Sequence, residues 1–316
     1  MKGFAIVGDG EVTKLHAKNI ERIGRLIALC GADDSETKTL ATEYNANIYS
    51  SLDELLSEEK EVDIIVVCSP TGLHAEHIIK SLQAGKDVVC EAPLCLTKAA
   101  AWQIIETEKY CQRRLYLIQP SRFYASINQL RDDLKEGNVK VRSFHLNCSL
   151  FLPADFRSSA DSKQFPGGGL LYKPFGSLID ILVFLFGEIV SVNGFVSYPF
   201  DKTMEDVEDT GAVSLKMQDG VIGTLHWSSV IAGQPTLTIL AENSFMQAHL
   251  DDPGLLKLQS GWRLSDDFAE DISNGFYKTV YEDLYKALRG KDVSFTGSLD
   301  GAKTVEAIEK IYKAVR

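Results

Sequence analysis

Short apolar runs that alternate with helical stretches fill the first 120 or so residues, and they constrain the fold more than any other feature. The runs are continuously apolar, as strands buried on both faces are. One intervening stretch, Ala75–Ala84, carries its apolar residues on one helical face. The alternation predicts a parallel sheet with crossover helices that ends near Arg122. The predicted strands are Phe4–Val7, Leu26–Cys30, Ile64–Cys68, Asp87–Cys90 and Leu115–Ile118.

Beyond Arg122 the pattern changes to strand-like segments with hairpin signals at Gln218-Asp219-Gly220 and Glu242-Asn243. Because single cores stop growing at about 250–300 residues, we predict two domains, 1–122 and 123–316. The second is an α+β domain with a large, mostly antiparallel open sheet. Its predicted strands are Val141–Leu150, Val190–Ser197, Gly211–Lys216, Gly220–Ser228, Pro235–Ala241 and Ser244–Leu250. Its predicted helices are Ser126–Glu136, Gly176–Phe186, Asn274–Arg289 and Asp300–Val315.

Charge and hydropathy exclude two classes of partner. The 44 acidic and 33 basic residues give a net charge of −11, which repels a nucleic-acid backbone. No apolar run reaches the roughly 18–20 residues that span a bilayer, and the start, MKGFAIVGDG, turns to glycine too early for a signal peptide. We expect a cytoplasmic protein with no nucleic-acid or membrane partner.

Six cysteines are scattered through the chain without a CxxC pair or histidines at ligand spacing. We interpret them as free thiols in a reducing compartment and expect no metal site. They are Cys30, Cys68, Cys90, Cys95, Cys111 and Cys148.

A glycine pair lies directly after the first predicted strand and before a helix. In such a turn the missing side chains let a pyrophosphate approach backbone N–H groups and the positive helix end. A plain tight turn also produces this pattern, and the third position of the motif is Thr13 rather than glycine or alanine. The order strand, turn, helix favours a Rossmann dinucleotide-binding domain. The predicted contacts are Gly8, Asp9, Gly10, Glu11 and Val12.

An acidic residue after the second strand would accept hydrogen bonds from the adenosine ribose. Asp33 is the nearest candidate, because Gly31 stands at the usual first position. No arginine follows to neutralise a 2′-phosphate, so NAD is favoured, with NADP possible. The alternative is that Asp33 and Asp34 form a solvated turn that caps the next helix.

The third predicted strand ends in Ser69-Pro70-Thr71, followed by His74. A loop at the carboxyl edge of a parallel sheet lies where ligands bind, so Ser69, Pro70 and Thr71 are predicted to line the nicotinamide ribose. His74 either joins this site or caps its helix.

In order and spacing, the motifs together resemble the Gfo/Idh/MocA oxidoreductases, which act mostly on sugars and cyclitols. The matching segments are GDG, KLHAKNI with His16, CSPTGLH, GKDVVCEAP, QPSRF, GGG, LIDILVFLFG and EDTGAV. The resemblance implies a Rossmann domain and a second domain whose open sheet often forms dimers or tetramers. It also implies that Gly8, Gly10, Ser69, Pro70, His74 and Glu91 line the NAD(P) site, and we add Ala92 and Gln119.

The catalytic signature departs from the family's pattern. Glu91-Ala92-Pro93 stands where the family has Glu-Lys-Pro, and a methyl group carries no proton. In GGGLLYKPFGSLID, Lys173, Phe175 and Ser177 replace the family's Asp, Gly and His, while Asp180 remains.

Carbinol oxidation needs a proton acceptor within about 3 Å of the hydroxyl oxygen. Lys173 is the candidate, with Tyr172 or Tyr124 as its proton partner; the alternative is a surface lysine.

Substrate contacts are predicted at Arg122, Arg157 and Ser177, with Lys163 as a further cation for an anionic group. His145 and His226 either bind substrate hydroxyls or are sheet histidines with their own partners. The segment 153–166 is either a loop over the substrate or a solvated connection.

The leading hypothesis is an NAD(P)-dependent oxidoreductase acting on a sugar, a nucleotide sugar or another sugar derivative. The alternatives are a reductase of a conjugated acceptor, and a cofactor-binding protein without turnover that serves as a sensor or partner subunit.

Overall fold

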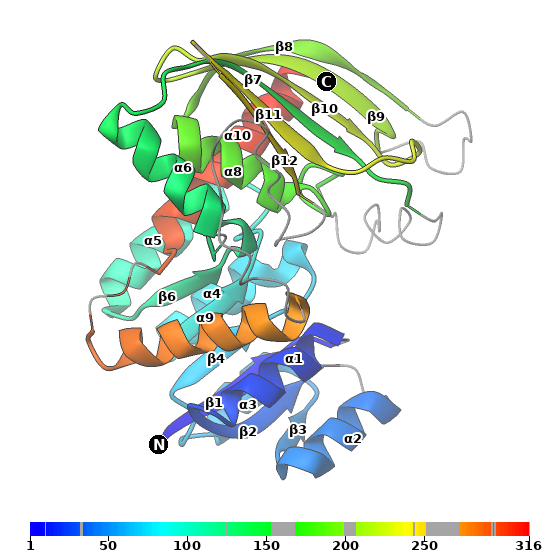
Figure 1. Ribbon diagram of the computed structural model, residues 1–316. Coiled ribbons are helices and arrows are strands. Elements are labelled where there is room, and N and C mark those ends of the chain that lie inside the picture. Colours follow the sequence, from blue (N-terminus) through cyan, green and yellow to red (C-terminus); the bar gives the residue numbers. More distant parts are fainter. Residues whose placement is uncertain are drawn as a thin grey trace. The chain divides into compact units, whose positions relative to one another are not determined.

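The structure is a computed structural model that describes the chain apart from residues 10, 32–33, 124, 153–167, 199–206, 243, 251–271, 292, 294 and 316. It divides into two compact units (Figure 1). Unit 1 is Met1–Gln119 with Ser273–Ala302, and unit 2 is Pro120–Ile272 with Lys303–Arg316. Each unit is built around one six-stranded sheet, called sheet A in unit 1 and sheet B in unit 2.

Sheet A is parallel, with strand order β3-β2-β1-β4-β5-β6. The order reverses between β1 and β4, which is the position where parallel α/β sheets bind ligands. Its strands are β1 (Lys2–Val7), β2 (Gly24–Cys30), β3 (Asn47–Tyr49), β4 (Ile64–Val67), β5 (Asp87–Glu91) and β6 (Leu115–Ile118). Five of the six were predicted. Three-residue β3 has no apolar run to reveal it.

Local capping fixes the ends of several helices in unit 1. The Thr97 hydroxyl accepts a hydrogen bond from Ala100 N, 3.1 Å away, and begins α5, which ends before Gln112 in the left-handed conformation. The helices in the first segment of unit 1 are α1 (Glu11–Ile20), α2 (Ser35–Tyr44), α3 (Leu52–Glu58), α4 (Thr71–Gln83) and α5 (Lys98–Cys111).

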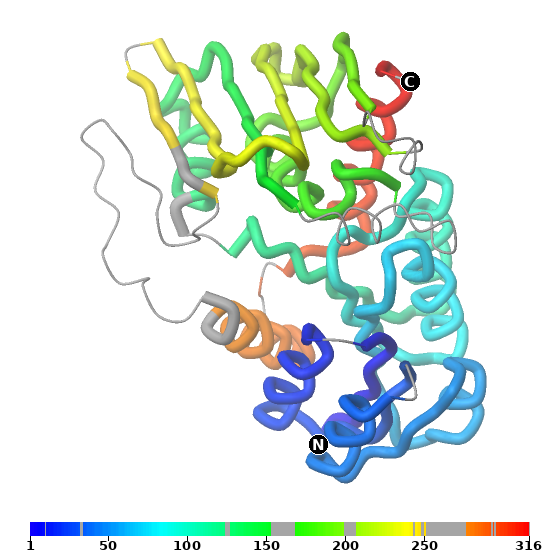
Figure 2. The backbone as a smooth tube through the Cα atoms, turned by 90° about the vertical axis from the view of Figure 1, so that its right-hand side faces the viewer, coloured from blue at the N-terminus to red at the C-terminus, as the bar shows by residue number. Residues whose placement is uncertain are grey.

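Helix α9 (Ile272–Leu288) joins unit 1 from far along the chain. It buries Val280, Tyr281 and Leu284 completely, and Tyr281 contacts His16 of α1. Figures 1 and 2 show α9 beside α1. The predicted boundary at residues 122 and 123 places this helix in the second domain. Unit 1 includes it because its apolar face is buried there.

Sheet B has the strand order β12-β11-β7-β10-β9-β8. Only the pair β7 and β10 is parallel, so the prediction of a mostly antiparallel sheet is confirmed. Its strands are β7 (Val141–Ser149), β8 (Ile189–Ser197), β9 (Thr210–Met217), β10 (Ile222–Ser228), β11 (Thr236–Ala241) and β12 (Phe245–His249).

Three helices cover one face of sheet B: α6 (Ala125–Glu136), α8 (Gly176–Phe186) and α10 (Ser298–Val315) (Figure 1). A short 3₁₀ turn, η1 (Pro120–Phe123), precedes α6. Alternate residues of the strands point into this layer, where Phe144 of β7 stacks on Phe186 of α8 with ring centroids 5.1 Å apart. Trp227 is fully buried in the same core.

None of the helices in the described ranges combines the length and apolar character of a membrane-spanning helix.

Candidate functional site

The turn after β1 requires glycine for two reasons. Gly8 has φ +142°, which side chains rarely adopt, and a Cβ there would lie 2.6 Å from the carbonyl carbon of Cys68 at the end of β4. A Cβ on Gly31 would lie 2.6 Å from the carbonyl oxygen of Gly8. The ends of β1, β2 and β4 therefore approach one another closely at the point where the strand order reverses.

Helix α1 begins at Glu11, directly after this turn, and its first N–H groups have no partners inside the helix. Asp9 and Glu11 are exposed, Val12 is 36% exposed, and Glu11 forms an ion pair with Lys14 at 2.7 Å. A bare turn followed by a helix N-terminus fits a pyrophosphate group. Gly10 lies outside the described residues.

Asp34 caps α2 by accepting a hydrogen bond of 2.7 Å from the backbone N–H of Thr37. This bond lowers the pKa of the exposed Asp34 carboxyl. The capping alternative is therefore confirmed for Asp34. Asp33 lies outside the described residues, and its contact with the ribose stays a prediction.

Ser69 and Pro70 lie in the loop that follows β4 at the carboxyl edge of sheet A, and Thr71 begins α4. The Ser69 hydroxyl lies 2.9 Å from Nδ1 of His77, whose pKa is lowered by burial. Pro70 is exposed and Thr71 is half-buried, so both residues contribute to the surface at this edge.

His74 is buried and links two loops. Its Nε2 lies 2.6 Å from the carbonyl oxygen of Ser69, and its Nδ1 lies 2.8 Å from that of Pro93. Because these partners are carbonyl oxygens rather than free helix N–H groups, His74 does not cap α4, and that alternative is wrong. The side chain instead ties the loop after β4 to the loop after β5.

Glu91, the last residue of β5, is the centre of a cluster that sequence patterns did not reveal. The Tyr277 hydroxyl donates a 2.7 Å hydrogen bond to Glu91 Oε1, and His16 Nε2 lies 3.1 Å from the same oxygen, outside hydrogen-bond angles. His16 Nδ1 lies 2.8 Å from the Tyr281 hydroxyl. We call Glu91, His16, Tyr277 and Tyr281 the Glu91 cluster. The sequence signals were Glu91 in GKDVVCEAP, His16 in KLHAKNI, and two tyrosines four residues apart in a helix.

Ala92 and Gln119 follow β5 and β6 at the same edge of sheet A. Ala92 is half-buried, and its backbone N–H donates to the carbonyl oxygen of Ile118 at 3.2 Å. Gln119 is 2% exposed, and its Oε1 accepts no hydrogen bond from the described residues. A buried acceptor of this kind fits a ligand that brings its own donor.

The described part of the GGG signature, Gly168 and Gly169, lies in unit 2, just before a turn that leads into α8. Tyr172 is buried and stacks on Tyr312 of α10, with ring centroids 6.2 Å apart. Lys173 is exposed, as expected if it is a surface lysine rather than a proton carrier. Its backbone N–H donates to Gly169 O at 3.3 Å. The Tyr312 hydroxyl accepts a hydrogen bond from Leu171 N and donates one to buried Glu208. The proton-relay role of Lys173 and Tyr172 stays a prediction.

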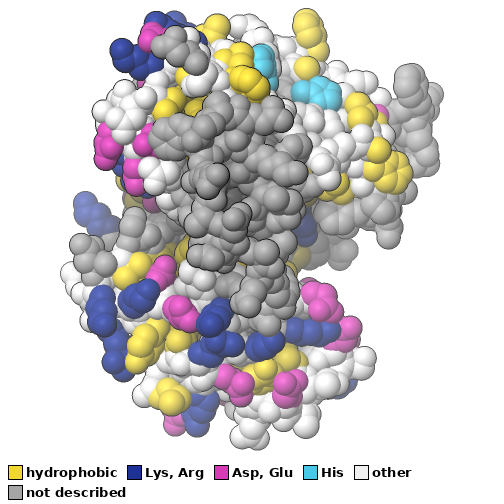
Figure 3. Space-filling view, in the orientation of Figure 1, with side chains coloured by type: hydrophobic (Ala, Val, Ile, Leu, Met, Phe, Trp, Pro, Cys, Tyr) yellow, Lys and Arg dark blue, Asp and Glu magenta, His cyan; other side chains and the backbone are white. Residues whose placement is uncertain are grey.

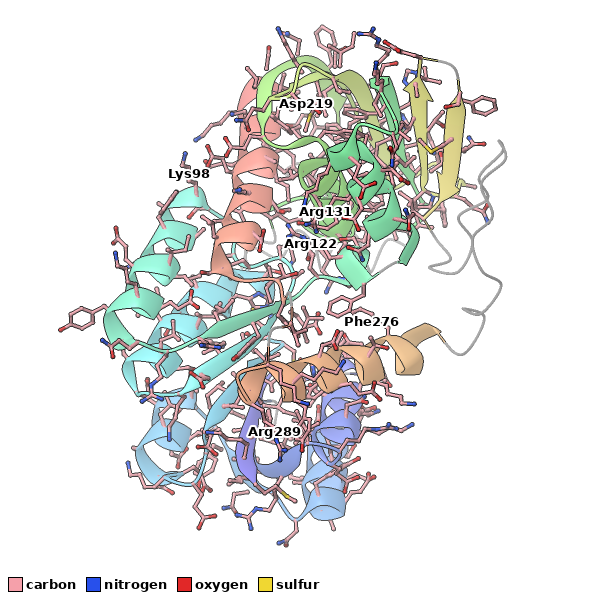
Figure 4. All side chains as sticks on the ribbon, turned by 60° about the vertical axis from the view of Figure 1, so that its left-hand side comes forward. Lys98, Arg122, Arg131, Asp219, Phe276 and Arg289 are labelled. Carbon is pink, nitrogen blue, oxygen red and sulfur yellow. The ribbon has the colours of Figure 1, made fainter. Side chains whose placement is uncertain are left out.

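Asp180 of α8 is fully buried and holds Arg122 by two hydrogen bonds of 2.9 Å. Ser121 and Thr304 donate to the same carboxylate at 3.0 and 2.7 Å. Figure 4 shows Arg122 and Arg131 close together, and both guanidinium groups lie over the ring of Phe184. Arg122 is therefore committed to Asp180, and its predicted contact with an anionic substrate gains no support from this geometry.

The remaining predicted residues divide into three sets. Ser177 is half-buried in the first turn of α8. His145 and His226 lie on sheet B with partners of their own, Thr224 for the first and Asn147 with Ser149 for the second. Outside the described residues lie Tyr124, Arg157, Lys163 and the whole segment 153–166.

Family models match both halves of the chain. Residues 2–118 match the model described as an oxidoreductase family with an NAD-binding Rossmann fold, and residues 127–247 match the Gfo/Idh/MocA C-terminal domain. The chain belongs to the Gfo/Idh/MocA oxidoreductase family. The resemblance drawn from the motifs, the Rossmann fold and the expectation of NAD are thereby confirmed.

Curated relatives are distant. D-glucoside 3-dehydrogenase of Escherichia coli (strain K12) is 25% identical over 234 residues, which cover 71% of this chain and 66% of the relative. Inositol 2-dehydrogenase of Rhizobium meliloti (strain 1021) is 24% identical over 221 residues, 68% of this chain and 64% of the relative. The chain thus spans about two thirds of the length of these relatives.

Solved structures share the fold over the whole chain. The WlbA dehydrogenase from Chromobacterium violaceum, crystallised with NADH and UDP-GlcNAcA, gives a TM-score of 0.86 at 23% identity and covers 100% of this chain and 94% of its own. The Bordetella pertussis WlbA dehydrogenase, with the same two ligands, gives 0.86 at 20% identity, with coverage of 100% and 95%.

Proposed function

We propose that this protein is an NAD-dependent oxidoreductase that acts on a sugar or a sugar derivative such as a nucleotide sugar. The observation that carries the proposal is the turn at Gly8, where the backbone is bare at the point where the strand order of sheet A reverses. The names of the relatives support the substrate class, because they include a glucoside and an inositol dehydrogenase.

In this proposal the residues at the carboxyl edge of sheet A bind the dinucleotide. The turn at Gly8 and the start of α1 hold the pyrophosphate, Asp33 accepts from the adenosine ribose, and the surface at Pro70 and Thr71 lies against the nicotinamide ribose. When bound, the nicotinamide accepts or donates a hydride. The protein then has to orient the nicotinamide ring and to transfer the hydroxyl proton of the substrate. In this proposal Lys173 transfers the proton.

A second candidate is a cofactor-binding protein without turnover. Ala92 supplies no proton carrier, and Arg122 and Asp180 neutralise each other inside unit 2. Lys173 is exposed and lies in a turn, and no side chain among the described residues of unit 2 contacts it in a way that would prepare it for proton transfer.

Two measurements separate these candidates. Nicotinamide fluorescence on titration with NADH and NADPH reports binding, and both candidates predict that NADH binds. Turnover is then assayed with a panel of sugars and nucleotide sugars. The enzyme proposal predicts turnover of at least one compound, and its loss in Lys173→Met with NADH affinity unchanged. NADH binding without turnover of any compound favours the second candidate, and turnover that survives Lys173→Met rejects the role of Lys173.

We also propose that sheet B joins two or more copies of this chain through its outward face. Alternation along the strands places mostly small, uncharged polar residues on this face, with Phe195 86% exposed and Ile222 57% exposed. Among the outward positions of β7 to β11, Lys216 is the one charged side chain in the described residues. Figure 3 shows few charged side chains over this region, in a chain of net charge −11.

Sedimentation of Phe195→Glu and Ile222→Glu tests this interface. Each variant is expected to shift the assembly toward the monomer, because a buried charge without a partner is costly. Tyr110→Glu, at a residue 89% exposed on α5, is the matched control and should leave the assembly unchanged. A wild-type monomer would reject the proposal.

A cytoplasmic location also remains part of the proposal. It is supported by the six cysteines, none of which forms a disulfide. Burial raises the pKa of the Cys30 thiol to about 11, which keeps it protonated and unreactive.

A further inference from the structure

The Glu91 cluster presents a single carboxylate to the carboxyl edge of sheet A. His16 and Tyr281 are fully buried and Tyr277 is nearly so, whereas 17% of the Glu91 side chain is exposed. Glu91 is therefore the member of the cluster that can meet a ligand, and the three others form its support.

The support fixes one oxygen and leaves the other open. Tyr277 donates to Oε1 at 2.7 Å, and His16 Nε2 approaches the same atom to 3.1 Å. Oε2 has no hydrogen-bond partner among the residues that the structure describes. A carboxylate held by one oxygen keeps a fixed direction, and its second oxygen remains available as an acceptor or as a negative charge.

No lysine or arginine among the described residues forms an ion pair with this carboxylate. The groups that face it are His16 of α1, Tyr277 and Tyr281 of α9, Cys68 after β4 and Cys90 of β5. Burial and the nearby Glu91 charge raise the pKa of both tyrosines, and burial raises the pKa of Cys68 to about 12, so these three stay neutral.

The residues that follow Glu91 add no positive charge. Ala92 and Pro93 continue the chain from β5 without an ionisable side chain. The end of β5 thus has an anionic character that a lysine at position 92 would cancel. Because the site is partly shielded from water, a charge here acts more strongly than one on the open surface.

We propose that Glu91, held by the Tyr277 hydroxyl, biases the bound dinucleotide toward its oxidised form. The oxidised nicotinamide ring carries a positive charge and the reduced ring carries none, so a nearby carboxylate stabilises the oxidised form selectively. The inference rests on the cofactor site proposed above. A site that favours the oxidised cofactor makes the bound reduced cofactor a stronger hydride donor, which favours the direction of substrate reduction.

The test compares dissociation constants for NAD⁺ and NADH, measured by calorimetry and fluorescence without any substrate. The quantity of interest is the ratio Kd(NADH)/Kd(NAD⁺). In Glu91→Gln this ratio is expected to fall about tenfold, since the shape is kept and the charge is lost. In Tyr277→Phe, which keeps the charge but frees the carboxylate to move, it is expected to fall about threefold.

Glu106→Gln is the matched control, because it removes one negative charge from an exposed site on α5 in the same unit. It should leave the ratio unchanged, and thermal unfolding of each free variant checks that the fold is intact. A ratio in Glu91→Gln within twofold of wild type, with both nucleotides bound, overturns the inference and leaves the cofactor site standing. If the wild-type protein binds neither nucleotide, the proposed function fails, and this inference fails with it.

Discussion

The carboxyl edge of sheet A and the start of α8 in unit 2 use their polar groups in opposite ways. At the sheet edge, no side chain of the described residues forms a hydrogen bond with Glu91 Oε2, with Gln119 Oε1 or with the turn at Gly8. At the start of α8, Asp180 receives four hydrogen bonds from Arg122, Ser121 and Thr304. Open polar groups are suited to a ligand, whereas mutually satisfied ones hold the fold together.

This difference separates the expected effects of substitution. Changes at the edge of sheet A should alter nucleotide binding more than stability. Changes around Asp180 should alter stability first, even though Asp180 stands where the family signature is retained.

The largest effect is expected for Asp180→Ala. This variant removes the buried carboxylate that pairs with the Arg122 guanidinium, whose side chain is 11% exposed, and breaking comparable pairs costs about 3–5 kcal/mol of unfolding free energy. Urea denaturation measures it. The double variant Asp180→Leu with Arg122→Met removes both charges and should regain most of the loss. A single variant as stable as wild type would show that the pair does not hold unit 2 together.

A smaller loss is expected for Tyr312→Phe. The hydroxyl bridges Leu171 N and the buried Glu208 carboxylate, so its removal leaves two buried groups short of a partner. Hydrogen bonds to charged groups contribute about 1.5–3 kcal/mol. Thermal unfolding should show this loss, whereas Tyr110→Phe on the surface should change stability by less than about 0.5 kcal/mol. Equal stability of the two variants would contradict the bridge.

The smallest effect concerns the pH dependence of the α2 cap. Because the folded pKa of Asp34 lies below its ordinary value of 3.8, the cap's contribution is complete above pH 3.8 and is lost as the pH falls through the folded pKa. Asp34→Asn still caps the helix but does not titrate. The unfolding free energy of wild type minus that of Asp34→Asn should therefore be smaller at about pH 3 than at about pH 7. A constant difference would contradict the assignment.

Local patterns sufficed to predict most of the fold. The continuous apolar runs of β1, β2, β4, β5 and β6 reflect burial on both faces of sheet A. Such burial can be predicted from a few consecutive residues of the sequence. The Gly8 turn was predictable for the same reason, because a tight turn between strand and helix involves only adjacent residues.

Long-range pairings could not be predicted in this way. Tyr277 binds Glu91 across 186 positions, and periodicity shows that a helical face is apolar but not which sheet it covers. An arginine that follows the last predicted strand of the first domain suggests an anionic ligand when the sequence alone is considered. The sequence does not show that Arg122 pairs with Asp180, because that residue lies 58 positions away.

The most direct test of the dinucleotide site is a titration of NADH against wild type, Gly8→Ala and Gly297→Ala, followed by nicotinamide fluorescence. A Cβ at Gly8 meets the backbone of Cys68 and forces the turn to shift, whereas a Cβ at Gly297 meets nothing within 4 Å. We predict that wild type and Gly297→Ala bind NADH alike, and that Gly8→Ala weakens binding about 5- to 150-fold, as an overpacking cost of about 1–3 kcal/mol implies. Equal affinity of all three proteins, or no binding by wild type, would contradict the account.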